Sequence, residues 1–175
     1  MNKFFIIPGY GNSDDDHWQT YFETKLINCT RIIQDSWDHP TCDDWVNGIN
    51  DSIVMEDLSN SILITHSLGG LALVHWANRF GKKPKGAMMV APPDLENPYQ
   101  DLNLESFTPI PLTKLNFPSI MVCSSNDYWS SMERSKLFSD AWGSKLVTLD
   151  NAGHINTDSG YGQWDQGLEI LKNLF

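Results

Sequence analysis

The chain has 175 residues, 41% of them hydrophobic, which predicts one globular domain over residues 1–175 with a sizeable core. Its 22 acidic and 12 basic residues give a formal charge of -10, which argues against a nucleic acid or an anionic membrane as partner. The longest apolar region is interrupted by polar residues and glycines, so no membrane span is expected. Three cysteines without C-x-x-C spacing favour reduced thiols in a soluble, cytoplasmic protein. The oligomeric state stays open.

Apolar runs alternate with helical patterns along the whole chain. Strands are predicted at residues 3–8, 30–34, 61–65, 86–91, 119–124 and 145–149, and helices at 14–27, 43–58, 68–80, 132–142 and 166–175. The stretch 95–117 has no clear period and is expected to face a substrate or form a rim. This alternation predicts the α/β class: a three-layer sandwich with a six-stranded parallel sheet and no large cap domain. Ligand chemistry then belongs at the carboxyl ends of the strands.

The first predicted strand runs into the glycine-rich turn Gly9-Tyr10-Gly11-Asn12. Such a turn can direct a backbone N–H toward a neighbouring site, and the Tyr10 N–H is a candidate donor of an oxyanion hole. An ordinary turn into a helix is the alternative. Because G-x-G-x-x-G is absent, a dinucleotide fold is excluded, and no cofactor is expected.

The predicted helix 14–27 opens with three aspartates, which favour the positive end of the helix dipole. Together with His17 they raise the alternative of a metal site. The alternating D-x-D-x-D-G pattern of a calcium loop is missing, so a charged helix start is favoured and no metal is expected. His17 and Trp18 are candidates to line the mouth of a site.

Residues 61–70, SILITHSLGG, read as a buried strand, a sharp turn and the start of a helix. This context suits a near match to the G-x-S-x-G nucleophile elbow, with Ser67 at the tip of the turn. The Leu68 N–H, at the helix N-terminus, is the candidate first oxyanion donor. Ser67 as a helix N-cap is the alternative.

Asp127 follows the fifth predicted strand and His154 follows the sixth. With Ser67 after the third strand, this gives the chain order Ser, Asp, His at the carboxyl ends of strands, as in α/β hydrolases. In that arrangement His154 accepts the Ser67 proton and Asp127 orients the imidazole.

Other residues compete for these roles. Asp94 is an alternative acid, although its position beside two prolines suits a turn or a pocket rim. His66 adjoins the serine but should point away from it, His75 is expected to be a core residue of a helix, and His39 a surface or capping residue. Tyr128 and Trp129 are candidates for the pocket.

Eight dispersed motifs resemble the retinoblastoma-binding protein nine family of small serine hydrolases, in its bacterial branch. They are PGYGNS (8–13), DHWQ (16–19), WDHP (37–40), DDW (43–45), HSLG (66–69), APPD (91–94), AWG (141–143) and AGHIN (152–156). The likeness, over about residues 3–171, implies a compact α/β-hydrolase fold without a large lid, a triad at Ser67, Asp127 and His154, and esterase-like activity. Thr65 stands where many α/β hydrolases carry glycine. No Leu-x-Cys-x-Glu pattern surrounds the cysteines, so the partner in the family name is not carried over.

Two functions follow from these residues. The first is a serine hydrolase that cleaves a small acyl ester, amide or thioester through an acyl-enzyme at Ser67. The second is a non-catalytic binding module of the same fold that holds a ligand or partner at an aromatic rim of Tyr10, Tyr128 and Trp129.

Overall fold

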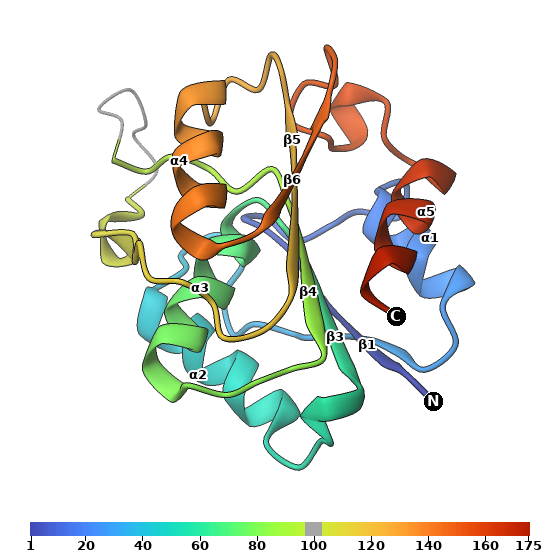
Figure 1. Cartoon of the computed structure of the whole chain (residues 1–175), viewed down its shortest axis with the longest axis vertical. Coiled ribbons are helices and arrows are strands. Elements are labelled where there is room, and N and C mark those ends of the chain that lie inside the picture. Colours follow the sequence, from blue (N-terminus) through green and yellow to red (C-terminus); the bar gives the residue numbers. More distant parts are fainter. Residues whose placement is uncertain (97–102) are drawn as a thin grey trace.

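Six parallel strands form the central sheet of the molecule (Figure 1). The computed structural model describes residues 1–96 and 103–175. In chain order the strands are β1 (Lys3–Ile7), β2 (Cys29–Arg31), β3 (Ser61–His66), β4 (Gly86–Val90), β5 (Ser119–Ser124) and β6 (Lys145–Leu149). Across the sheet they follow the order β2-β1-β3-β4-β5-β6, and each neighbouring pair is parallel. The predicted six-stranded parallel sheet is confirmed.

Helices cover both faces of this sheet (Figure 1). On one face lie α2 (Cys42–Ile53), α3 (Leu68–Phe80) and α4 (Met132–Trp142), and on the other lie α1 (Trp18–Lys25) and α5 (Asp165–Leu171). The result is the predicted three-layer arrangement.

Strand side chains alternate between the two helical layers because successive residues of a strand point to opposite faces. In β1, Phe5 and Ile7 belong to the core beneath α2 and α3, whereas Phe4 and Ile6 belong to the core beneath α1 and α5. All residues of β3, β4 and β5 are buried. Burial on both faces explains why these strands read as continuous apolar runs.

The helix boundaries differ from the predicted ones where local turns intervene. The predicted start at residue 14 is wrong: Asp16 N–H donates to Asp14 Oδ1 in a turn, and α1 begins at Trp18 with His17 as its N-cap. α2 ends at Ile53 rather than at residue 58. β2 is shorter than the predicted 30–34, and α5 gives way to a 3-10 turn after Leu171.

The segment 95–117 forms a rim only in part. Leu95 and Leu104 line the pocket described below. Its later apolar residues are buried in the core on the side of α2, α3 and α4: Phe107, Ile110, Leu115 and Phe117. Residues 97–102 of this predicted segment lie outside the described residues.

The three cysteines are free thiols. Burial raises the pKa of Cys29 to about 12 and that of Cys42 to about 11, so neither supplies a thiolate near neutral pH. None of the helices in the described part of the chain combines the length and apolar character needed to cross a bilayer.

Candidate active site

Ser67 forms the turn between β3 and α3. Its backbone torsions are φ 51° and ψ -125°, a conformation that residues other than glycine adopt only when their surroundings hold it. Two hydrogen bonds of 2.9 Å do so, from Ser67 N–H to the Val90 oxygen and from Gly70 N–H to the Ser67 oxygen. Ser67 occupies the N-cap position of α3, but its side chain makes no capping hydrogen bond to the helix.

Two glycines after Ser67 let this turn pack against its neighbours. A Cβ on Gly69 would overlap the carbonyl oxygens of Ile7 and Pro8 at the end of β1. A Cβ on Gly70 would lie 3.3 Å from Thr65 Oγ1. Thr65 is fully buried, and the bare Gly70 leaves room for its hydroxyl. The threonine therefore fits the elbow in the place where many hydrolases have glycine.

The three side chains expected to meet at the carboxyl edge of the sheet form one hydrogen-bonded chain. His154 Nε2 lies 2.9 Å from Ser67 Oγ, and His154 Nδ1 lies 3.0 Å from both carboxylate oxygens of Asp127. The imidazole and the carboxylate are buried, with 6% and 2% of their side chains exposed. Because a carboxylate accepts, Nδ1 carries the proton and Nε2 is left to accept from the serine hydroxyl.

Polar residues after β5 and β6 hold together the loops that carry the carboxylate and the imidazole. Ser124 Oγ donates to Asn126 Oδ1 (2.8 Å) and accepts from Ala152 N–H (2.9 Å). Asn126 Oδ1 also accepts from Gly153 N–H (2.8 Å). Sequence reasoning missed Ser124 and Asn126. The available signal was their position at the carboxyl end of a buried strand.

Two buried side chains fix the backbone around His154. His66 Nε2 donates to the His154 carbonyl oxygen (3.0 Å), and Trp18 Nε1 donates to the Ile155 carbonyl oxygen (2.9 Å). The prediction that Trp18 lines the mouth of the site is wrong, because this side chain is fully buried between α1, α5 and the sheet. His66 turns away from the neighbouring serine, as expected.

Gln19 is a further buried polar residue that the sequence did not single out. Its Nε2 donates to the carbonyl oxygens of Ile7 (3.3 Å) and Ile64 (3.4 Å), and its Oε1 accepts from Ser13 Oγ (2.6 Å). These bonds join the ends of β1 and β3, the two strands that lead into the glycine-rich turn and the elbow.

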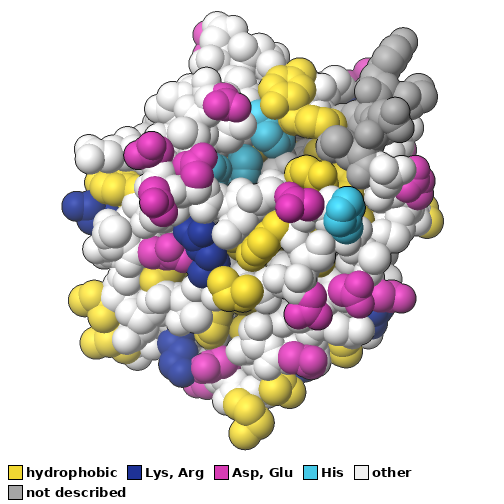
Figure 2. All heavy atoms as spheres, turned by 180° about the vertical axis from the view of Figure 1, so that it is seen from behind, with side chains coloured by type: hydrophobic (Ala, Val, Ile, Leu, Met, Phe, Trp, Pro, Cys, Tyr) yellow, Lys and Arg dark blue, Asp and Glu magenta, His cyan; other side chains and the backbone are white. Residues whose placement is uncertain are grey.

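A pocket of about 230 Å³ opens above Ser67. Its lining comprises Tyr10, Asn12, Asp14, His17, His66, Ser67, Leu68, Pro93, Leu95, Leu104, Tyr128, Trp129, His154, Asn156, Thr157 and Asp158. Figure 2 shows histidines in a hollow, with acidic side chains on one side and hydrophobic ones on the other. Of the predicted site residues, Trp18 and Asp127 do not line this pocket, and Asp127 is joined to it through its hydrogen bonds to His154.

The glycine-rich turn after β1 lies directly against the elbow. A Cβ on Gly9 would lie 2.9 Å from Ser67 Cβ and 3.5 Å from the Leu68 nitrogen. Within residues 1–96 and 103–175, neither the Tyr10 N–H nor the Leu68 N–H meets an acceptor. Both residues line the pocket, so two unpaired backbone donors adjoin the serine.

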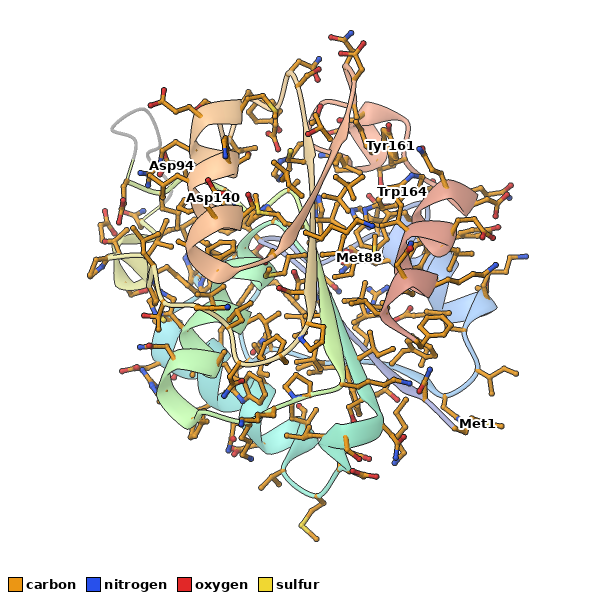
Figure 3. All side chains as sticks on the ribbon, viewed as in Figure 1. Met1, Met88, Asp94, Asp140, Tyr161 and Trp164 are labelled. Carbon is orange, nitrogen blue, oxygen red and sulfur yellow. The ribbon has the colours of Figure 1, made fainter. Side chains whose placement is uncertain are left out.

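The competing candidates have other partners. Asp94 lies beside α4 (Figure 3), where its Oδ1 accepts from Arg134 (3.0 Å). His75 Nε2 donates to the Phe107 carbonyl oxygen (2.9 Å), as suits a half-buried structural histidine. His39 is exposed, as predicted.

Comparison with solved structures agrees with this architecture. A YdeN-like hydrolase from Pectobacterium atrosepticum is 32% identical, with a TM-score of 0.87 over 99% of this chain and 90% of that one. The ydeN gene product of Bacillus subtilis (17% identity, TM-score 0.86) matches over 100% of this chain and 99% of its own. Carboxylesterase CesB from Bacillus subtilis is 13% identical, with a TM-score of 0.69 over 99% of this chain and 83% of that one. The likenesses to the ydeN gene product and to CesB show the fold alone.

The fold is therefore a compact α/β-hydrolase fold. A search among curated proteins found no match. The family model described as serine hydrolase matches residues 4–173, nearly the whole chain. On this match and the 32% identity to the Pectobacterium hydrolase, the chain belongs to the serine hydrolase family.

Proposed function

We propose that this protein hydrolyses small, uncharged carboxylic esters through an acyl-enzyme formed on Ser67. The observation that carries this proposal is the hydrogen-bonded chain from Ser67 through His154 to Asp127, at the wall of a pocket. A nucleophile, a base and an orienting carboxylate within hydrogen-bond reach are the requirements of acyl transfer by serine.

In the first half of the reaction, His154 Nε2 accepts the hydroxyl proton while Ser67 Oγ attacks the ester carbonyl carbon. The Tyr10 and Leu68 N–H groups bind the oxyanion of the tetrahedral intermediate. The intermediate collapses, the C–O bond to the alcohol breaks, and His154 returns the proton to the departing alkoxide.

In the second half, water replaces the alcohol. His154 takes a proton from the water as it attacks the acyl-enzyme, and then gives the proton to Ser67 Oγ when the acid leaves. Asp127 stays ionised throughout and stabilises the imidazolium that forms twice in each cycle.

The size and charge of the pocket favour small substrates without negative charge. A volume of about 230 Å³ suits a short acyl chain, and Leu95, Leu104 and Trp129 supply apolar surface. Among the described residues, the charged lining residues other than histidine are Asp14 and Asp158, both acidic, which disfavours carboxylates and phosphates. One fold relative is itself a carboxylesterase.

The proposal also includes the subfamily, the cellular compartment and the type of bond that is cleaved. The motif likeness supports a place in the bacterial branch of the retinoblastoma-binding protein nine family. Free cysteines support a reducing, cytoplasmic compartment. The substrate is a small molecule, and thioesters and amides are further candidates for the scissile bond.

A fluorophosphonate probe tests the proposal directly. We expect it to label Ser67 in the folded protein, and we expect Ser67→Ala and His154→Ala to remove nearly all turnover of 4-nitrophenyl butyrate. A folded protein that takes no label and hydrolyses no member of a panel of esters, thioesters and amides would contradict this function. Ligand-induced thermal stabilisation that survives Ser67→Ala would then favour the binding module.

A further inference from the structure

We propose that His17 binds the substrate of this site as a neutral hydrogen-bond donor, through Nε2–H, to an uncharged oxygen next to the reacting ester. The inference rests on the proposed function and adds the chemical class of substrate: short esters that carry a second, neutral acceptor such as an ether or carbonyl oxygen.

The position of the proton on His17 follows from the start of α1. His17 is the N-cap of this helix, and its Nδ1 accepts the Gln19 N–H at 3.1 Å. A nitrogen that accepts carries no proton, so the proton of the neutral ring is on Nε2. Burial lowers the pKa of His17 to about 4, which leaves the ring uncharged at neutral pH.

The remaining nitrogen of His17, Nε2, is the atom left to bind a ligand. The residue is 5% exposed, and no residue in the described ranges forms a hydrogen bond with its Nε2. Among the described residues, His17 Nε2 is not one of the fully buried polar atoms without a partner, so this nitrogen is open to a pocket although the rest of the side chain is buried. A donor held in this way at a pocket wall is free to bind an oxygen of a ligand.

The ring of His17 adjoins the pocket above Ser67. It lies edge-on to the ring of His66, with 4.8 Å between centroids, and both residues line this pocket. His17 also borders a second, more open depression near Thr20 and Gly162, which His66 does not line. The contact with His66 and the effect of His154 on the pKa of His17 favour the pocket of the nucleophile, and the proposal takes Nε2 to face that pocket.

The charge around His17 restricts the acceptor that it can bind. Asp14 is close enough to act on the pKa of His17, and Asp158 is on the pocket wall as well. An anionic acceptor would be repelled by both carboxylates, whereas an ether, carbonyl or hydroxyl oxygen would not. The backbone donors at Tyr10 and Leu68 already serve the reacting carbonyl, so His17 is left for another oxygen of the substrate.

Matched substrates that differ by one oxygen test this role. On the acyl side we compare 4-nitrophenyl butyrate with 4-nitrophenyl methoxyacetate, and on the alcohol side butyl butyrate with 2-methoxyethyl butyrate. In each pair an ether oxygen replaces one methylene group. The variant is His17→Asn, because asparagine is a strong N-cap residue but is too short to replace Nε2–H.

We expect the preference for the ether over its carbon analogue, measured as kcat/KM, to fall by about 3- to 10-fold in His17→Asn for at least one pair. The intrinsic reactivity of each ester cancels because each ratio is compared between two enzymes. An unchanged ratio for both pairs, with wild-type turnover intact, would overturn the role of His17 and leave the proposed function standing.

A second measurement does not depend on turnover. In the Ser67→Ala background, affinities for butyl butyrate and 2-methoxyethyl butyrate should show the same dependence on His17. A long-range proton–nitrogen correlation spectrum of the wild-type protein should place the His17 proton on Nε2. A proton on Nδ1, or equal loss of affinity for both esters, would overturn the inference.

Discussion

The Trp18 Nε1–H donates a hydrogen bond of 2.9 Å to the carbonyl oxygen of Ile155, the residue after His154. Trp18 opens α1 and is completely buried, so the imidazole loop is fastened to the helical layer formed by α1 and α5. The bond does not involve the reacting atoms themselves. It orients the backbone that carries the imidazole.

Trp18→Phe should therefore reduce both stability and turnover. The buried carbonyl oxygen of Ile155 would lose its donor, at a cost of about 1–3 kcal/mol in the free energy of unfolding. We expect kcat to fall about 10-fold or more, because small displacements of a catalytic group slow proton transfer strongly. Urea unfolding and steady-state kinetics measure the two effects.

Trp164→Phe is the matched control for that variant. Trp164 lies in the layer of α5 (Figure 3), and its ring centroid is 5.2 Å from that of Trp18. Its Nε1 is buried without a hydrogen-bond partner in residues 1–96 and 103–175. This change should cost stability by lost packing but spare kcat. An equal fall of kcat in both variants would show that aromatic packing, and not the bond to Ile155, matters.

Asp127→Asn should lower kcat by about 10,000-fold while the protein stays folded, because the amide no longer fixes the proton on His154 Nδ1. Asp94→Asn is the matched control, since Asp94 pairs with Arg134 instead. Rates of ester hydrolysis and of fluorophosphonate labelling check both variants. Comparable losses from the two substitutions would contradict the assignment of the acid.

The two buried histidines beside the base should make the protein sensitive to acid. Burial lowers the pKa of His17 to about 4 and that of His66 well below 6.5. His17 faces Asp14, Arg31 and His154, and His66 faces His154 and His17. Below pH 6.5 the unfolded chain binds protons at these positions that the folded protein does not.

The free energy of unfolding should therefore keep the full contribution of these histidines above pH 6.5, and it should fall as the pH drops from about 6.5 to 4. For His17 alone the fall saturates near 3 kcal/mol, at about 1.36 kcal/mol per unit of pKa. Urea unfolding at pH 7.5, 6 and 5 measures it, and His17→Asn should flatten the slope. The same slope in wild type and variant would contradict the prediction.

Gly69→Ala should destabilise the fold more than Gly70→Ala. The new methyl group at position 69 would meet backbone oxygens at the end of β1, which cannot move without disturbing the sheet, so a loss of about 3 kcal/mol is expected. At position 70 the methyl group meets Thr65 Oγ1 and Pro92 Cβ at 3.3 Å, where small shifts suffice. Thermal unfolding of both variants decides the order.

The sequence predicted the sheet, the layers and the meeting of three distant residues, because apolar runs and crossover lengths determine a parallel sheet. The end of each strand then placed Ser67, Asp127 and His154 at one edge. No local pattern could place Trp18, because a tryptophan at a helix start looks the same whether it faces a pocket or a core.

The supporting hydrogen bonds were beyond prediction for a related reason. Ser124 and Asn126 pair with the backbone at Ala152 and Gly153 only because β5 and β6 are neighbours in register. Such bonds depend on the distance between two loops in the folded protein, which the amino-acid sequence alone does not give. Boundaries of β2 and α1 were missed because local turns override propensity.

Ser67 keeps φ at 51° although it carries a Cβ, and glycine would adopt the same torsion without that steric cost. Ser67→Gly should therefore unfold at a higher temperature than Ser67→Ala, by the equivalent of about 1 kcal/mol, as calorimetry can check. An equal or lower melting point would contradict this. Under the proposed function, the strained torsion lowers stability at the position of the nucleophile, and the glycine variant that relieves this strain would lack the reactive hydroxyl.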